Sequence, residues 1–255
     1  RAGNSPRTTD DHGARTAHRR DAARGHCAGL DRDSAREPLA ARAYRMKFAV
    51  PRNQHAVARV RQLFAAALDY ELPAAPPDYG IRDRFASQGR QRYLVFLHGT
   101  TWPTKHWPES YWTELADMVA RAGMQVKLPW GNAAERQRAE RIAAADPAVE
   151  VLPRRQLGEL AALIASASGV VGVDTGLVHL AAALGTPCIT LYGATDPGLI
   201  GTLGDAQLHL QAQFVCAPCK RRKCSYQGAA VVQPACYSSL PPSLVWARMS
   251  GMLAD

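Results

Sequence analysis

Residues Val170–Tyr192 read VVGVDTGLVHLAAALGTPCITLY, and this stretch decides the fold. The apolar run Val170–Val173 is typical of a buried strand. Leu177–Leu184 predicts a helix that stops at Gly185, a residue suited to the position after a helix end. Ile189–Tyr192 predicts the next strand. A strand, a helix and a second strand in close succession form one crossover unit of a parallel sheet.

The same alternation extends from this unit toward the N-terminus. Apolar runs predict strands, and the amphipathic segments between them predict helices. The expected strands are Tyr93–Leu97, Met124–Leu128 and Ala148–Leu152, and the expected helices are Pro108–Ala122, Ala133–Ala145 and Leu157–Ser166. Five strands alternating with helices predict a Rossmann-like, doubly wound, mainly parallel α/β domain over residues 91–255.

The N-terminal part of the chain is different. Residues 1–26 contain no Val, Ile, Leu, Phe, Tyr, Trp or Met, so they show neither helical nor strand periodicity. Two interpretations stay open for them, a disordered basic segment and a stretch outside the natural reading frame. Residues 54–70 predict an amphipathic helix, and residues 71–90, rich in Pro, Gly and charge, predict a linker. The predicted apolar stripe of that helix is Val57, Val60, Phe64, Ala67 and Leu68.

The composition is that of a globular protein with a basic surface. The 255 residues are 47% hydrophobic and 21% charged, with a formal net charge of +9. These values exclude global disorder, collagen and coiled coil, and the charge favours anionic partners. The longest nearly apolar stretch, residues 161–173, is too short for a membrane span, which needs about 20 residues. With no recognisable signal peptide and six cysteines, too few for a disulfide-dense secreted scaffold, the expected location is the cytoplasm.

Polar side chains follow the predicted strands at the edge where open parallel sheets bind ligands. Hydroxyls and a lysine can bind a diphosphate, the start of a helix favours phosphate, and carboxylates accept hydrogen bonds from sugar hydroxyls. The candidate set is Thr100, Thr101, Lys105, Glu135, Arg155, Asp174, Thr175, Gly176 and His179.

Four of these residues also have a purely structural interpretation. Asp174 and Thr175 could cap a helix, His179 could be a core histidine with satisfied hydrogen bonds, and Lys105 could be a solvated surface lysine. The chain has no G-x-x-x-x-G-K-[ST] phosphate loop and no G-x-G-x-x-G after a strand, which disfavours ATPase and dehydrogenase functions.

Four cysteines form a second constellation, with the spacing C-x2-C-x4-C-x11-C. Four thiolates can close a tetrahedral zinc site, but the second pair is not a C-x-x-C, so reduced structural thiols or a redox-labile loop are preferred. The basic run Lys220–Lys223 lies among them, without the recognition helix that a nucleic-acid-binding module requires. Lipid or sugar phosphate is therefore its expected partner, not nucleic acid. The cysteines are Cys216, Cys219, Cys224 and Cys236.

Several of these motifs together resemble the lipopolysaccharide heptosyltransferases of glycosyltransferase family 9. The motifs are His98–Glu109 (HGTTWPTKHWPE), Lys127–Gly131 (KLPWG), Val173–Leu180 (VDTGLVHL) and Tyr192–Gly198 (YGATDPG). The resemblance covers about Ala28 to the end, and the two threonines before the Lys-His-Trp-Pro motif favour the type that adds the first heptose.

The resemblance implies a GT-B enzyme whose second domain, the Rossmann-like domain predicted above, binds the donor. It implies inverting transfer of L-glycero-D-manno-heptose from ADP-heptose to Kdo2-lipid A without metal or cofactor, at the cytoplasmic face of the inner membrane. By the same resemblance, Thr100, Thr101 and Lys105 would hold the diphosphate, Lys105 also stabilising the leaving group. Glu135 would meet the ribose, with Arg155 near the adenine. The heptose–phosphate junction would be bound by Asp174, Thr175, Gly176 and His179.

One part of the family pattern has no counterpart in this chain. The family's general base is an Asp near the beginning of the acceptor domain, and neither Asp10 nor Asp11 lies in a strand motif that would qualify. Residues 27–90 are expected to be the remnant of that domain plus the linker. The expected behaviour is therefore weak binding of ADP or ADP-heptose and slow or absent transfer. Three alternatives stay open: another GT-B sugar-nucleotide enzyme or an epimerase, a non-catalytic nucleotide-binding fragment, and a basic zinc-bearing nucleic-acid module.

Overall fold

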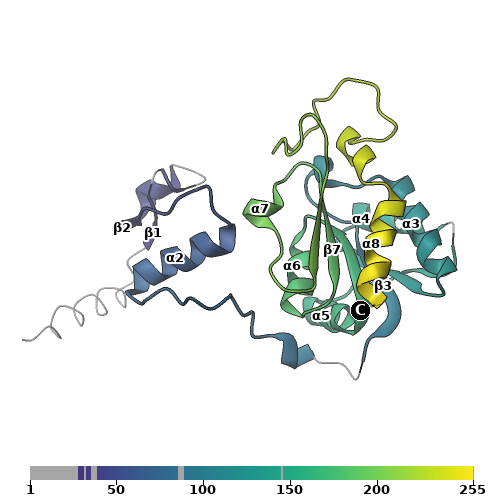
Figure 1. Ribbon diagram of the computed structural model, residues 1–255, viewed down its shortest axis with the longest axis horizontal. Helices are drawn as coiled ribbons and strands as arrows, with labels where there is room; N and C mark the ends of the chain where they lie inside the picture. Colours follow the sequence, from purple (N-terminus) through teal and green to yellow (C-terminus); the bar gives the residue numbers. More distant parts are fainter. Residues whose placement is uncertain (1–27, 32, 36–38, 86–88, 145, 255) are drawn as a thin grey trace, which may run out of the picture. The chain divides into compact units, whose positions relative to one another are not determined.

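The computed structural model describes residues 28–31, 33–35, 39–85, 89–144 and 146–254. The chain divides into two compact units, Arg1–Pro76 and Pro77–Asp255 (Figure 1). The second unit begins before residue 91, where the sequence placed the domain boundary. The expectations for residues 1–26, including Asp10 and Asp11, lie outside the described residues.

The described part of the smaller unit is a short parallel strand pair and one long helix. Strands β1 (Ala28–Leu30) and β2 (Met46–Phe48) pair with Ala28 opposite Met46, and the 3-10 helix η1 (Ala40–Ala43) lies between them in the chain. Helix α2 (Ala56–Leu68) confirms the predicted helix and contacts both strands.

The predicted apolar stripe of α2 is not a buried face in the described structure. Val60, Phe64 and Leu68 are 51%, 53% and 53% exposed, and Ala65 is the buried residue of the helix. The sequence prediction of a core-facing stripe is therefore wrong for these positions. The physical reason is that two three-residue strands offer too little apolar surface to cover a helix of this length.

The larger unit is built on a six-stranded parallel sheet in the order β5-β4-β3-β6-β7-β8. This confirms the predicted doubly wound α/β fold. The strands are β3 (Gln91–Leu97), β4 (Gln125–Leu128), β5 (Val149–Val151), β6 (Ala167–Val173), β7 (Cys188–Tyr192) and β8 (Gln207–Gln211). The helices are η2 (Arg82–Phe85), η3 (Pro103–Lys105), α3 (Glu109–Arg121), α4 (Ala133–Ala143), α5 (Leu157–Ser166), α6 (Gly176–Ala183), α7 (Pro197–Ile200), η4 (Ala235–Ser239) and α8 (Pro242–Ala254).

Three elements of this unit differ from the sequence expectation. Strand β8 was not predicted, because its sequence QLHLQ has no apolar run and all of its residues are half-buried at the edge of the sheet. Helix α8, also unpredicted, packs beside α3. The expected linker is in part structured, since η2 contacts α5 and Phe85 packs against the core.

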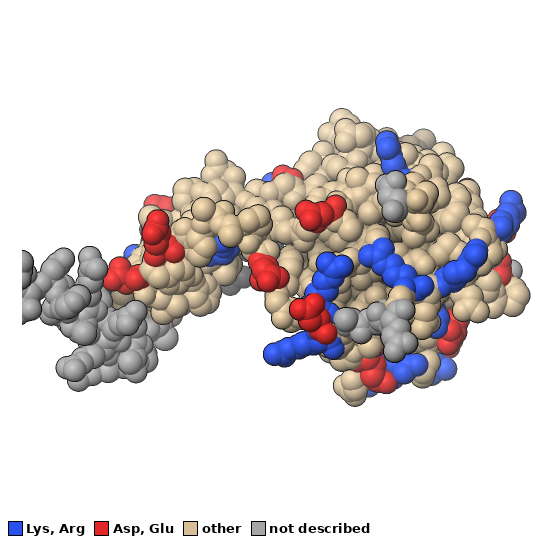
Figure 2. Space-filling model, turned by 60° about the horizontal axis from the view of Figure 1, so that its bottom comes forward, with Lys and Arg blue, Asp and Glu red and all other residues tan. Residues whose placement is uncertain are grey.

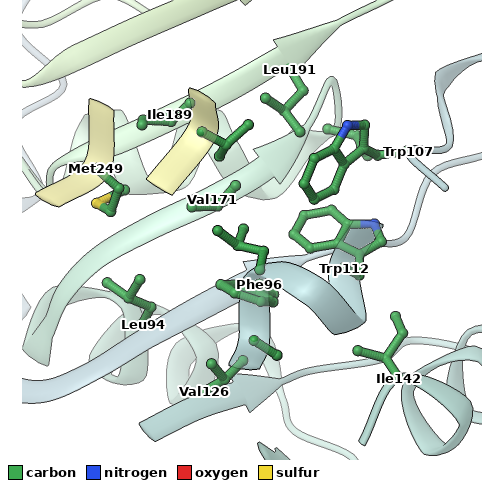
Figure 3. Close-up of a cluster of buried hydrophobic side chains, with 14 of the residues drawn as sticks. Leu94, Phe96, Trp107, Trp112, Val126, Ile142, Val171, Ile189, Leu191 and Met249 are labelled. Carbon is green, nitrogen blue, oxygen red and sulfur yellow. The ribbon is translucent and has the colours of Figure 1, made fainter. Parts of the chain in front are cut away.

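Helices cover both faces of the sheet, and each face has its own core. Residues of α3, α4 and α8 pack on one face and residues of α5 and α6 on the other (Figure 1). On the first face Phe96 lies 5.1 Å from Trp112, and Trp112 lies 4.9 Å from Trp107, measured between ring centroids (Figure 3). The indole N–H of Trp107 donates to the carbonyl of Leu240 at 3.0 Å. These rings anchor the segment that leaves β3.

The order of the strands indicates where at the carboxyl ends of the sheet a ligand would bind. Strand β3 pairs with β4 on one side and with β6 on the other, so the direction of winding reverses between β3 and β6. In doubly wound sheets ligands bind at the carboxyl ends of the strands at such a switch point. The segments after β3, β4 and β6 therefore define the candidate site.

Candidate functional site

An ion pair joins the segments that follow β3 and β6. Lys105 Nζ lies 2.7 Å from Asp174 Oδ2, and the two side chains are 15% and 7% exposed. The hydroxyl of Thr195, after β7, donates to the same carboxylate oxygen at 2.8 Å. The hydroxyl of Thr100 donates to the carbonyl of Asp174 at 3.2 Å. Lys105 is thus a paired, largely buried cation, which contradicts its interpretation as a solvated surface lysine.

The first turn of α6 continues this site. Thr175 is its N-cap residue and makes no side-chain capping hydrogen bond, so the capping interpretation is wrong for this side chain. No heavy atom other than its neighbours in the chain lies within 4 Å of the position of a Cβ on Gly176. The N–H groups at a helix start are free to bind an anion, and His179 lies half-buried within the same first turn.

A cavity of about 260 Å³ lies beside this helix start. Three of the sequence-predicted residues, Glu135, Arg155 and Thr175, line it. Its other walls are Leu97, Gly99, Pro129, Trp130, Gly131, Arg154, Leu160 and Leu177. The remaining predicted residues lie along the rim formed by the segments after β3 and β6. A cavity with apolar walls and a few charged groups is typical of small-molecule sites.

Local hydrogen bonds fix the position of Glu135 at this cavity. Its N–H donates to the side chain of Asn132, the N-cap residue of α4, at 3.0 Å. Its Oε2 accepts from the N–H of Gly131 at 2.7 Å. A Cβ on Gly99 would lie 2.7 Å from Glu135 Cδ, so this carboxylate position requires glycine at residue 99. The backbone thus holds the carboxylate at the wall of the cavity.

Two further residues of the cavity have structural partners. Arg155 forms an exposed ion pair with Glu159 at 3.0 Å. Its guanidinium therefore contacts the first turn of α5. The indole N–H of Trp130 donates to the carbonyl of Leu152 at 2.6 Å, which holds the ring as a wall. Trp130 was not among the residues predicted from the sequence. Its position in the segment after β4 could have indicated it, because Lys105 was predicted from the segment that follows β3.

A buried histidine, His98, directly follows β3. His98 is fully buried, and burial lowers its pKa to about 4, with a further contribution from the charge of Arg138 and then of His106. Glu109 pairs with Arg141 through two hydrogen bonds of 2.7 and 2.8 Å. His98 is therefore neutral at pH 7 and adds no positive charge beside Lys105.

The cysteine-rich segment also reaches the site. The N–H of Lys220 donates to the carbonyl of Ala194 at 2.7 Å, and Thr104 donates to the carbonyl of Arg221 at 2.6 Å. Within the described ranges no three His, Cys, Asp or Glu side chains form a group that could hold a metal ion. The zinc alternative, which requires Cys216, Cys219, Cys224 and Cys236 as ligands, therefore stays an untested prediction.

One face of the larger unit is rich in basic side chains. Figure 2 shows a face of this unit on which Lys and Arg side chains gather, with Asp and Glu side chains between them. Among the described helices, none combines the length and apolarity that a bilayer crossing demands.

Comparison with known proteins assigns the chain to a family. The model of glycosyltransferase family 9 (heptosyltransferase) matches residues 19–230. Lipopolysaccharide heptosyltransferase 1 of Pseudomonas aeruginosa is 51% identical over 89% of this chain and 67% of that protein. The protein of the same name from Escherichia coli K12 is 48% identical over 72% of this chain and 59% of that protein. The structure of E. coli heptosyltransferase WaaC with ADP superposes with a TM-score of 0.71 at 40% identity, covering 88% of this chain and 65% of that one.

Fold and comparisons together define the class as an α/β glycosyltransferase of the GT-B type. The chain belongs to glycosyltransferase family 9, the heptosyltransferases, and this confirms the resemblance inferred from the motifs. It spans between 57% and 67% of the length of four curated heptosyltransferase 1 relatives.

Proposed function

We propose that the larger unit is the donor-binding part of a heptosyltransferase of lipopolysaccharide inner-core biosynthesis. The reaction is inverting transfer of L-glycero-D-manno-heptose from ADP-heptose to Kdo2-lipid A, without metal or cofactor. Family membership supports it, as do the named structures of E. coli WaaC with ADP and with ADP-2-deoxy-2-fluoro heptose. The observation that carries the proposal is the Lys105–Asp174 pair at the start of α6, next to the cavity lined by Glu135.

The proposed donor occupies the cavity with its nucleoside and the rim with its phosphates. Glu135 accepts hydrogen bonds from the ribose hydroxyls, and the segment around Arg155 lies near the adenine. The apolar side chains of Leu160 and Leu177 in the lining of the cavity suit a flat base. The proposed diphosphate ligands are Thr100, Thr101, Lys105 and the N–H groups of Thr175 and Gly176, with Asp174 and His179 at the junction to the heptose.

In this arrangement Lys105 assists departure of the ADP. Negative charge grows on the diphosphate as the glycosidic bond breaks, and a preorganised ammonium group stabilises that charge at no reorganisation cost. Asp174, which accepts a hydrogen bond from the Thr195 hydroxyl, holds the ammonium in place before the donor arrives. The acceptor hydroxyl must lose a proton as it attacks, and a carboxylate base contributes about 10²- to 10⁴-fold to such a step. The family resemblance assigns that base to the acceptor domain.

The acceptor and the place of action are part of the same proposal. The formal net charge of +9 and the basic face of Figure 2 suit a lipid acceptor with anionic groups and peripheral attachment to an anionic membrane surface. The proposed place of action is the cytoplasmic face of the inner membrane.

The test is a transfer assay with ADP-heptose and Kdo2-lipid A, read by mass spectrometry of the lipid and by ADP release. The complete P. aeruginosa relative serves as the reference enzyme. We expect ADP-heptose to bind in competition with ADP and the lipid to gain one heptose, at a rate below the reference. Binding of UDP-sugars in preference to ADP-heptose would refute the proposal in favour of another GT-B sugar-nucleotide enzyme.

A further inference from the structure

The basic segment Lys220–Lys223 is fixed against the candidate site by its backbone. The Lys220 N–H is bonded to Ala194, in the segment after β7, and the Arg221 carbonyl is bonded to Thr104, in η3. Lys220 has a φ of +54°, a left-handed conformation that residues other than glycine rarely adopt. The segment is therefore held in one conformation by two neighbouring parts of the site.

One side chain of this segment shares an aromatic ring with the site lysine. The guanidinium of Arg222 lies over the ring of Trp102, 5.3 Å from its centroid. The ammonium of Lys105 lies over the same ring, 4.7 Å from the centroid. Two cations therefore flank one indole, which is a favourable platform for each of them.

The charges of these two neighbours are balanced differently. Lys105 is paired with Asp174 and largely buried. Arg222 is exposed, and no carboxylate forms an ion pair with it among the described residues. The side chain of the preceding residue, Arg221, donates to the hydroxyl of Ser225 at 2.8 Å. Arg222 is thus an exposed cation that lies beside Lys105 and has no ion-pair partner among the described residues.

We propose that Arg222 is a substrate-binding residue that holds an anionic group, a phosphate or a carboxylate, beside Lys105. The inference rests on the proposed function, which supplies two sources of such a group: the diphosphate of the donor and the acidic groups of the acceptor. A planar guanidinium suits both, because it donates two parallel hydrogen bonds to either anion. The contact with Trp102 restrains the guanidinium, which lowers the entropy lost on binding.

The test measures binding of ADP, AMP, inorganic pyrophosphate and free Kdo to the full chain by titration calorimetry. The variants are Arg222→Gln, Arg222→Lys and the matched control Arg221→Gln, and thermal melting verifies that each folds. We expect Arg222→Gln to weaken one class of anion by about tenfold, the loss of a charged hydrogen-bonding group, while Arg221→Gln has no effect. Arg222→Lys should recover part of the loss.

The probes separate the two sources and the two proposals. Weaker binding of ADP and pyrophosphate, with AMP less affected, identifies the donor diphosphate, whereas a loss restricted to Kdo identifies the acceptor. Unchanged binding of every probe to Arg222→Gln, or an equal loss in Arg221→Gln, would overturn the inference. Failure of the unaltered chain to bind ADP would overturn the proposed function, and pyrophosphate binding that depends on Arg222 would then still support the inference.

Discussion

The ammonium of Lys105 and the carboxylate of Asp174 meet at 2.7 Å, although their segments leave different strands of the sheet. Thr195 donates to the same carboxylate from a third segment. The pair is therefore the contact that ties three strand ends together at the topological switch point. It gives the candidate site its geometry before any ligand is bound.

Breaking this pair should destabilise the fold in a non-additive way. Lys105→Met leaves Asp174 buried without its cation, and Asp174→Leu leaves Lys105 without its anion. Each single change should lower the free energy of unfolding by about 2 kcal/mol, because an unpaired buried charge is costly. The double variant should lose less than the two single losses combined. Urea unfolding of the four proteins measures this, and strictly additive losses would contradict the account.

The carboxylate of Glu135 should accept hydrogen bonds from the ribose hydroxyls of ADP. Glu135→Gln should bind ADP about tenfold more weakly, since a charged hydrogen bond to a hydroxyl is replaced by a neutral one. The same change should matter less for ADP analogues whose ribose hydroxyls are removed. Glu140→Gln is the matched control, because Glu140 lies on the same helix and pairs with the exposed Arg136 at 2.8 Å. Equal affinities of the two variants would argue against this role.

The buried histidine should make the larger unit sensitive to acid. Burial lowers the pKa of folded His98 to about 4, whereas an unfolded histidine has its ordinary pKa near 6.5. The unfolded chain therefore binds the proton first. Stability is complete above pH 6.5 and should fall by about 3 kcal/mol as the pH drops toward 4. Urea unfolding between pH 7.5 and pH 4.5, followed by tryptophan fluorescence, measures the slope.

His98→Asn is the comparison for this slope. The variant should be less stable at pH 7.5, because it loses core packing, but its stability should depend less on pH between 6.5 and 4.5. An identical slope in both proteins would show that other groups cause the acid sensitivity.

The cysteines should differ in their reactivity toward iodoacetamide. Burial raises the pKa of the Cys188 thiol to about 12 and that of Cys236 to about 11, the latter with a further contribution from the neighbouring thiols. These two remain protonated at pH 8 and should react only after unfolding. The exposed Cys216 and Cys224 should be alkylated within minutes, as peptide mapping by mass spectrometry would show. Protection of Cys216 and Cys224 that a chelator removes would instead restore the zinc alternative.

The sequence predicted those parts of the fold that depend on continuous apolar runs. Strands β6 and β7 are buried over most of their length, so most of their residues are apolar. Strand β8 lies at the sheet edge and alternates polar and apolar residues over five positions, too short a pattern to distinguish from a loop. The stripe of α2 was visible in the sequence, but whether a stripe is buried depends on what else packs there.

The candidate site could be predicted in outline for a related reason. Parallel strands bring their carboxyl ends to one edge, so segments that follow strands must be neighbours. The partners within the site could not be predicted, because they depend on which side chain reaches across the edge. Asp174 was expected to accept hydrogen bonds from a sugar, and the structure pairs it with Lys105. The contact of Arg222 with Trp102 joins residues that are far apart in the chain. No sequence pattern therefore predicted it.

Titration calorimetry of the purified chain with ADP, and in parallel with UDP, tests the donor site most directly. We expect one ADP to bind per chain with an affinity that Lys105→Met and Glu135→Gln each reduce, and we expect UDP to bind more weakly. No heat with ADP, or equal affinity for ADP and UDP in the unaltered chain, would contradict this expectation.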